Sequence, residues 1–117
     1  MRERGNYGED MAVRLLKKEG YQILERNYYC RMGEIDIIAK DGEYIVFVEV
    51  KLRKNNDFGG ASFAIDKRKQ EKIRKTALYY LQRFPTEVSV RFDAVLITAG
   101  DGKIQNKDME LIQNAFC

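Results

Sequence analysis

The sequence predicts an α/β fold in which a central mixed β-sheet is flanked by helices, in the order αβββαβα. Two observations predict the elements: apolar residues recur with a helical period in some segments, and in others they alternate or form short runs. A third observation, the chain length of 117 residues, predicts a single domain spanning residues 1–117 with one core.

Turn and cap signals separate these segments. Gly20 ends the first helix, Asp41-Gly42 is a strong hairpin signal, and Asp66 can cap the long helix that follows it. The predicted elements, in chain order, are a helix over Tyr7–Glu19, strands over Tyr21–Tyr29, Glu34–Lys40 and Tyr44–Arg53, a helix over Asp66–Phe84, a strand over Ser89–Thr98, and a short helix over Lys107–Ala115.

The composition excludes several kinds of chemistry. The chain has no histidine and only two cysteines, Cys30 and Cys117, which removes histidine-dependent nucleophile systems and zinc sites. No apolar run approaches the ~20 residues of a membrane span, and the N-terminal residues lack the apolar stretch of a signal peptide. We therefore expect a cytoplasmic protein with reduced thiols and no membrane partner, whose chemistry comes from carboxylates, lysines, hydroxyls or bound metal.

Basic residues concentrate in one segment. From Lys51 to Lys75 there are nine Lys or Arg residues and three Asp or Glu residues, a net charge of +6 in a chain whose total is +3. A basic stripe suggests a polyanion partner such as nucleic acid, although a charge run by itself more often marks a solvated helix face. The residues predicted to contact phosphates are Lys54, Lys67, Arg68 and Lys69.

Two carboxylates and a lysine lie in the segment Gly33–Arg53. Strand side chains alternate between faces, so Glu49 and Lys51 share one face of their strand. The hairpin register decides whether Asp36 joins them. A two-residue loop at Asp41-Gly42 makes Glu49 its diagonal neighbour, a four-residue loop sets the two acids directly opposite, and an odd loop separates them. The Asp-Gly signal favours an even loop and hence a shared face.

Paired carboxylates on an otherwise apolar sheet repel one another and lose solvation. A divalent cation relieves both effects, and hard oxygen ligands suit magnesium. The pattern Asp36…Glu49-x-Lys51 therefore predicts a metal site with an ammonium group beside it. A salt-bridged cluster, in which Lys51 pairs with either acid and no metal binds, explains the same pattern. Arg91 and Asp93 also alternate onto one face, and a buried pair is the simplest account of them.

The motifs GEIDIIA and VFVEVK resemble those of the PD-(D/E)XK nuclease superfamily, which includes restriction endonucleases and Holliday-junction resolvases. Ile35 stands where the superfamily name has proline. Nearly the whole chain is also similar to the YraN-like family of uncharacterised, predicted bacterial endonucleases, in which GEID is usual. The matching segments are Arg4–Ala12, Gly20–Tyr28, Gly33–Ala39, Val46–Lys51, Gly59–Gln70 and Arg91–Ile97.

This resemblance implies a restriction-endonuclease-like fold forming one resolvase-like nuclease domain, and it implies roles for particular residues. Asp36 and Glu49 would bind the metal, and Lys51 would orient or deprotonate the attacking water. Glu9 falls where resolvase-like members carry a further acid, although a helix N-terminus favours an acid in any case. Gln70 falls where some of these nucleases place a polar helper, and is otherwise an ordinary surface residue.

The resulting hypothesis is the hydrolysis of phosphodiester bonds with Mg²⁺ or Mn²⁺, held by Asp36, Glu49 and the carbonyl of Val50. The expected partner is nucleic acid, DNA rather than RNA, and a homodimer stays open by analogy with resolvases. Two other readings remain: a non-catalytic nucleic-acid-binding module on the same fold, and a structural or partner-binding domain with a salt-bridged cluster.

Overall fold

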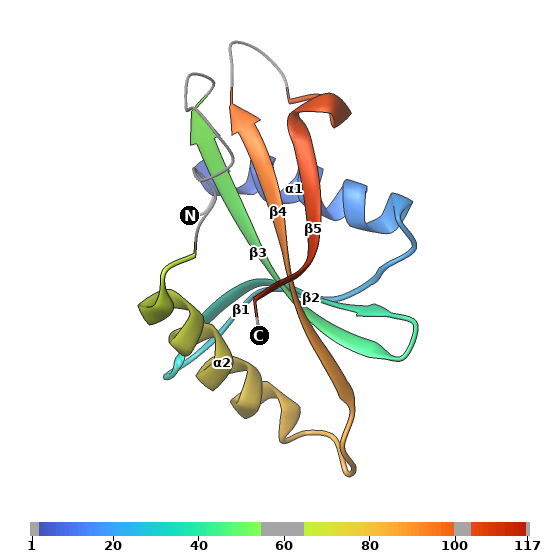
Figure 1. The fold of residues 1–117 in the computed structure, drawn as a ribbon, viewed down its shortest axis with the longest axis vertical. Helices are drawn as coiled ribbons and strands as arrows, with labels where there is room; N and C mark the ends of the chain where they lie inside the picture. Colours follow the sequence, from blue (N-terminus) through green and yellow to red (C-terminus); the bar gives the residue numbers. More distant parts are fainter. Residues whose placement is uncertain (1–2, 55–64, 100–103, 117) are drawn as a thin grey trace.

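The computed structural model describes residues 3–54, 65–99 and 104–116 (Figure 1). Five strands form one mixed sheet in the order β1-β2-β3-β4-β5, in which only the β3–β4 pair is parallel. This arrangement confirms the α/β prediction and is consistent with a restriction-endonuclease-like fold. The elements are α1 (Glu3–Lys18), β1 (Gln22–Cys30), β2 (Gly33–Asp41), β3 (Tyr44–Lys54), α2 (Lys67–Leu81), β4 (Ser89–Ala99), a 3-10 turn (Asn106–Asp108) and β5 (Met109–Phe116).

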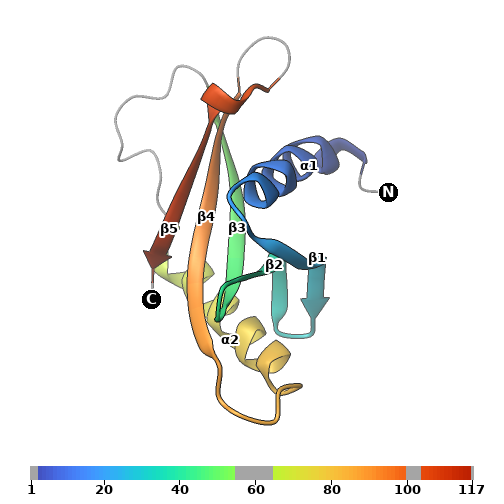
Figure 2. The same ribbon diagram turned by 90° about the vertical axis from the view of Figure 1, so that its right-hand side faces the viewer.

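The two helices bury apolar stripes against opposite faces of this sheet (Figure 2). Helix α1 contributes Ala12, Val13 and Leu16 to one core, where they pack with valines and isoleucines of β2, β3 and β4. Helix α2 connects the parallel strands β3 and β4, and its buried residues pack with Phe47 and Ile38 on the other face. Within the described residues neither helix is long and apolar enough to cross a membrane.

The β2–β3 hairpin has the register that brings the two acids together. Asp41 pairs with Tyr44 across a two-residue turn, and Gly42 takes the positive φ of 60° that such a turn requires. The turn is therefore one residue later than the predicted Asp41-Gly42 pair. This shift gives the register expected for the longer even loop. The recorded pairs end at Ile37 and Val48, and the same register continued by one residue would set Asp36 opposite Glu49.

A buried polar network connects the strands on the α1 side of the sheet, and it confirms the predicted Arg91–Asp93 pair. Asp93 is 0% exposed and accepts hydrogen bonds from Arg91 Nε at 2.9 Å and Tyr21 Oη at 2.6 Å. The Arg91 guanidinium also donates to Asp41 Oδ2 at 2.8 Å, and the backbone N–H of Asn114 donates to Asp93 at 2.9 Å. Residues at the ends of β2, β4 and β5 are thereby fixed to the start of β1.

The predicted helix over Lys107–Ala115 is wrong. These residues form the short 3-10 turn and strand β5, which pairs antiparallel with β4. Met, Glu, Leu, Gln and Ala favour helices, but the free edge of β4 offers a ladder of hydrogen bonds and an apolar surface. Phe116 stacks on Phe92 at 5.0 Å between ring centroids, and Leu111 packs on the α1-side core. Tertiary pairing therefore overrides local propensity at this element.

Gly33 begins β2 where the β1–β2 hairpin meets α2. Its φ is +148°, and a Cβ built on it would lie 2.9 Å from Oγ1 of Thr76, a buried residue. Gly33→Ala should therefore lower the free energy of unfolding by about 1–3 kcal/mol, through backbone strain and a contact that a packed helix cannot relieve. Urea denaturation measures this loss.

Gly20→Ala is the control for Gly33→Ala. The φ of Gly20 is +96°, but nothing lies within 4 Å of a Cβ built there. An equal loss in both variants would mean that backbone strain alone destabilises Gly33→Ala and that the contact with Thr76 adds nothing.

Candidate metal centre

Asp36 and Glu49 lie where β2 and β3 diverge. The recorded β2–β3 pairs end at Ile37 and Val48, whereas β3 continues to pair with β4 as far as Lys54. Beyond that point the backbone N–H of Val50 donates to Asp36 Oδ2 at 2.8 Å. This bond fixes the Asp36 carboxylate beside β3, on the face that carries Glu49.

Burial and mutual repulsion make this pair electrostatically costly. Burial first, and then the negative charge of Asp36, raises the pKa of Glu49 to about 7, against the opposing effect of Lys69. Burial also raises the pKa of Asp36, although the bond from Val50 and the charge of Lys69 oppose that rise. The two acids therefore interact directly, as the shared-face prediction required, and positive charge at this point stabilises them.

Lys69 supplies part of that charge. Its Nζ lies 3.4 Å from Glu49 Oε2, so the recorded ion pair of Glu49 is made from α2. The predicted N-cap Asp66 is confirmed, because its carboxylate accepts the backbone N–H of Lys69 at 2.8 Å. The cap thus holds the first turn of α2 with Lys69 directed at the acids. The sequence placed Lys69 among phosphate contacts and considered Lys51 as the salt-bridge partner.

Lys51 is also present at the site. It lines a cavity of about 270 Å³ together with Glu49, Val50, Ile65, Asp66 and Lys69. Lys51 and Glu49 project on one face of β3, as strand alternation predicts. The cavity therefore has two acids, Glu49 and Asp66, and two lysines along its wall, and Val50 on the same wall binds the Asp36 carboxylate.

The remaining predicted residues, Glu9 and Gln70, lie on the two helices. Glu9 is 8% exposed on α1 and sits 3.8 Å from the Arg26 guanidinium of β1. Gln70 donates to the carbonyl of Ile65 at 2.6 Å and accepts from Arg74 at 3.3 Å, so its amide braces the start of α2. In the part of the chain that the structure describes, no three Asp, Glu or Cys side chains gather as a metal-binding group, so Glu9 does not join the pair.

The predicted phosphate contacts are distributed unevenly. Lys67 and Arg68 are exposed in the first turn of α2, next to Lys69. Lys54 ends β3, but its side chain lies outside the part that the structure describes. The positive charge near the carboxylates therefore comes from the start of α2 and from β3.

The residues present fit a magnesium or manganese ion held by few protein ligands. Two neighbouring carboxylates offer hard oxygen donors, and their raised pKa values reflect a need for compensating positive charge. Mg²⁺ is commonly held by one or two carboxylates plus substrate phosphates and water, so a pair of acids is enough for it, although no three acids of the described residues form a metal-binding group. Asp36 and Glu49 would hold the ion, and Val50, whose N–H already fixes Asp36, is next to both.

Comparison with known proteins assigns the chain to a family. Residues 8–97 match the model of a family described as uncharacterised protein family UPF0102. A UPF0102 protein of Caldicellulosiruptor saccharolyticus is 48% identical over 116 residues, covering 98% of each chain. The chain belongs to the UPF0102 family. A Nitrosospira multiformis member is 44% identical over 116 residues, covering 99% of this chain and 94% of the relative.

The UPF0102 assignment agrees with the YraN-like resemblance in the sequence and is consistent with the PD-(D/E)XK superfamily. A third UPF0102 protein, from Thermodesulfovibrio yellowstonii, is 44% identical over 114 residues, covering 97% of this chain and 96% of the relative. The matched range 8–97 includes both acids, Lys51 and the first turn of α2, whereas β5 lies beyond it. The family assignment thus covers the whole candidate metal centre.

The pairing of Lys69 with Glu49 is the part of this UPF0102 site that sequence reasoning missed. Lys69 lies 20 residues from Glu49 along the chain, in a different element, and the intervening segment includes residues outside the described part. One signal was available: Asp66 was predicted to cap α2, which sets Lys69 in the first helical turn. The sequence gives no rule for which sheet residue that turn faces.

The raised pKa of Glu49 predicts a pH-dependent stability in this UPF0102 protein. The folded state keeps the proton up to about pH 7, whereas an unfolded glutamate releases it near 4.5. The free energy of unfolding should therefore fall as the pH rises between these values, by on the order of 2 kcal/mol, and then level off. Glu49→Gln should match the wild type near about pH 4 and exceed it near about pH 8.

Urea denaturation with a metal chelator measures this difference. Glu43→Gln, which changes an exposed acid in the hairpin turn, serves as the control and should leave the wild-type pH slope unchanged. Identical pH slopes for the wild type and Glu49→Gln would mean that burial and Asp36 do not raise the pKa of Glu49.

Proposed function

We propose that the chain is a metal-dependent nuclease that hydrolyses phosphodiester bonds, in DNA rather than RNA, with Mg²⁺ or Mn²⁺ as cofactor. The observation that supports this most is the meeting of Asp36 and Glu49 in a partly buried pair beside Lys51 and Lys69. Buried like charges are costly for folding, and perturbed carboxylates in a cavity are characteristic of functional sites.

Each group has a task in this proposal. Asp36, held by the Val50 N–H, and Glu49 would bind the ion, and the Val50 carbonyl is the proposed third ligand. When bound, the ion polarises the phosphate and makes water more acidic. Lys51 orients the attacking water and stabilises the negative charge that develops on the phosphate oxygens. With an ion bound to the acids, Lys69 would be released from its ion pair with Glu49 and would contact a phosphate oxygen.

Residues outside the pair have supporting tasks. Lys54, Lys67 and Arg68 would contact the phosphate backbone and set the position of the strand without reading its sequence. Gln70 would keep the start of α2 in place through the Ile65 carbonyl. Glu9 would act from the α1 side as a further acid near the substrate. We further propose that the protein works in the cytoplasm, and that a homodimer forms as in resolvases.

A non-catalytic nucleic-acid-binding module is the second candidate. Lys69 forms an ion pair with Glu49, which is the arrangement that a metal-free binding domain would keep. In that case the basic residues of α2 would bind phosphates, and no metal-dependent reaction would follow.

A cleavage panel separates these candidates. Single strands, duplexes, flaps, branched junctions and structured RNA are incubated with the full chain and Mg²⁺ or Mn²⁺, and with a chelator as the control. The nuclease proposal expects metal-dependent cleavage that Asp36→Asn abolishes. Binding without cleavage of any substrate in either metal would favour the binding module instead.

A further inference from the structure

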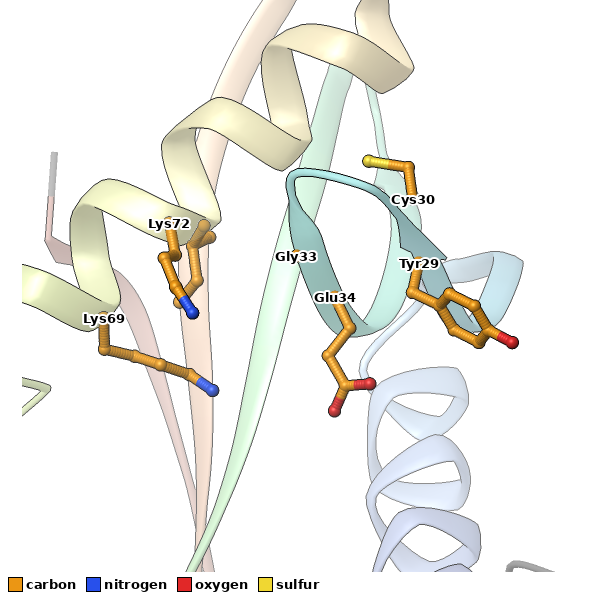
Figure 3. Close-up of a pocket in the computed structure, with 7 residues that line it drawn as sticks. Tyr29, Cys30, Gly33, Glu34, Lys69 and Lys72 are labelled. Carbon is orange, nitrogen blue, oxygen red and sulfur yellow. The ribbon is translucent and has the colours of Figure 1, made fainter.

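A second cavity, of about 380 Å³, lies between α2 and the end of the β1–β2 hairpin. Figure 3 shows the ammonium ends of Lys69 and Lys72 extending from α2 toward the hairpin, with Glu34 and Tyr29 on the hairpin side. Lys69 lines both this cavity and the one beside Glu49. The second cavity is therefore adjacent to the candidate metal centre, because Lys69 lines both.

The lining of this cavity combines positive charge with an exposed aromatic ring. Glu34 is the one acid that lines this cavity beside Lys69 and Lys72, the Lys69 ammonium also pairs with Glu49, and Tyr29 is 69% exposed. Tyr29 and Glu34 are cross-strand partners in the β1–β2 ladder, so their side chains share one face of the hairpin. Positive charge beside an aromatic ring is the combination with which proteins bind single strands: cations hold the backbone and bases stack on rings.

The position of this hairpin is set by close packing rather than by a loose loop. Gly33 approaches Thr76 so closely that no Cβ fits between them, which fixes the hairpin end against α2. The spacing between the end of the hairpin and α2, on which Tyr29 and the two lysines are carried, is thereby built into the fold.

We propose that this cavity is a subsite for one nucleotide of an unpaired nucleic-acid strand. Lys72 and Lys69 hold its phosphate, its base lies against Tyr29, and the Glu34 carboxylate accepts a hydrogen bond from a base amino group. The inference rests on the proposed nucleic-acid partner and adds the class of substrate, a strand with an unpaired segment at the cleavage site.

Two physical points favour an unpaired strand. A base within a duplex is stacked on both faces and has its pairing edge occupied, so Tyr29 and Glu34 reach these surfaces only when the base is unpaired. The Glu34 carboxylate also repels phosphate. This repulsion directs the sugar-phosphate backbone of the bound strand toward α2 and its base toward the hairpin. A carboxylate accepts from the amino group of cytosine, whereas thymine presents an acceptor there. A cytosine tail should therefore bind more tightly than a thymine tail.

Binding measured without metal tests this proposal separately from catalysis. Fluorescence anisotropy with a chelator compares a blunt duplex with the same duplex carrying a single-stranded cytosine tail. The tail should tighten binding about tenfold, and Tyr29→Ala or Lys72→Glu should each remove that gain. Tyr29→Phe keeps the stacking face and should retain it, as should Lys18→Glu, which makes the same charge change at an exposed lysine of α1.

The outcomes of the two proposals are distinguishable. Tail-dependent binding without any metal-dependent cleavage supports the subsite and contradicts the nuclease. Cleavage by a protein that binds blunt and tailed duplexes equally, with Tyr29→Ala without effect on either, overturns the subsite and leaves the nuclease intact.

Cys30 locates the bound strand directly. It lines the same cavity, and Cys117→Ser leaves it as the single thiol of the chain. Saturating single-stranded DNA should slow alkylation of Cys30 at least about fivefold, and a blunt duplex should not. A rate unchanged by a strand that anisotropy shows to be bound would place that strand elsewhere and overturn the proposal.

Discussion

Lys51→Ala is expected to lower the rate of metal-dependent cleavage by about 10²–10³-fold, the usual effect of removing one group that stabilises charge in the transition state. Lys51 projects with Glu49 into the 270 Å³ cavity, where a phosphate beside the metal ligands would lie. Binding of Mg²⁺ should not weaken, because the substitution removes a positive charge from beside the ion. Initial rates at saturating substrate measure the first effect, and calorimetry with Mg²⁺ measures the second.

Two matched variants make this result specific. Lys51→Arg retains the charge and should recover part of the rate, and Lys40→Ala removes an exposed lysine of β2 and should leave the rate within about twofold. Equal residual activity in Lys51→Ala and wild type would indicate a contaminating nuclease and would remove the assigned role of Lys51.

Asp93→Ala should lower the free energy of unfolding by about 3–5 kcal/mol, because it removes one partner of a buried ion pair. Asp93 is fully buried and accepts hydrogen bonds from Arg91, Tyr21 and Asn114. Without it, Arg91, whose side chain is 15% exposed, loses one of its two recorded carboxylate partners, and Tyr21 and Asn114 lose the acceptor to which they donate. Urea denaturation near neutral pH measures the loss.

Asp10→Ala is the control for this prediction. Asp10 also forms a close ion pair, with Arg26 at 2.7 Å, but its side chain is 51% exposed. Exposed pairs typically contribute less than about 1 kcal/mol, so this variant should stay near the wild type. Comparable losses in the two variants would mean that the buried network is not what stabilises the junction of the strands.

The sequence predicted those parts of the fold that depend on local pattern. Alternation placed Glu49 and Lys51 on one face of β3, and the turn signal at Gly42 favoured an even loop, which is why Asp36 was expected beside Glu49. The pairing of Arg91 with Asp93 followed from the same alternation. These features involve residues of one strand or one hairpin, where spacing along the chain determines which side chains share a face of the sheet.

The features that were missed depend on contacts between distant elements. The last segment favours a helix by composition but becomes β5, because β4 offers an unpaired edge. The ion pair between Lys69 and Glu49 requires the position of α2 over the sheet. The packing of Gly33 on Thr76 likewise joins segments that spacing along the chain does not relate.

Titration calorimetry with Mg²⁺ and Mn²⁺ on the full chain and on Asp36→Asn tests the metal centre most directly. Asparagine keeps the shape of Asp36 but removes the charge on which a divalent ion depends. The wild type should bind either ion, and Asp36→Asn should bind more than roughly tenfold more weakly, since even the loss of an outer-shell partner costs about that much. Equal affinity in both proteins, or no binding to the wild type, would contradict a metal site built from Asp36 and Glu49.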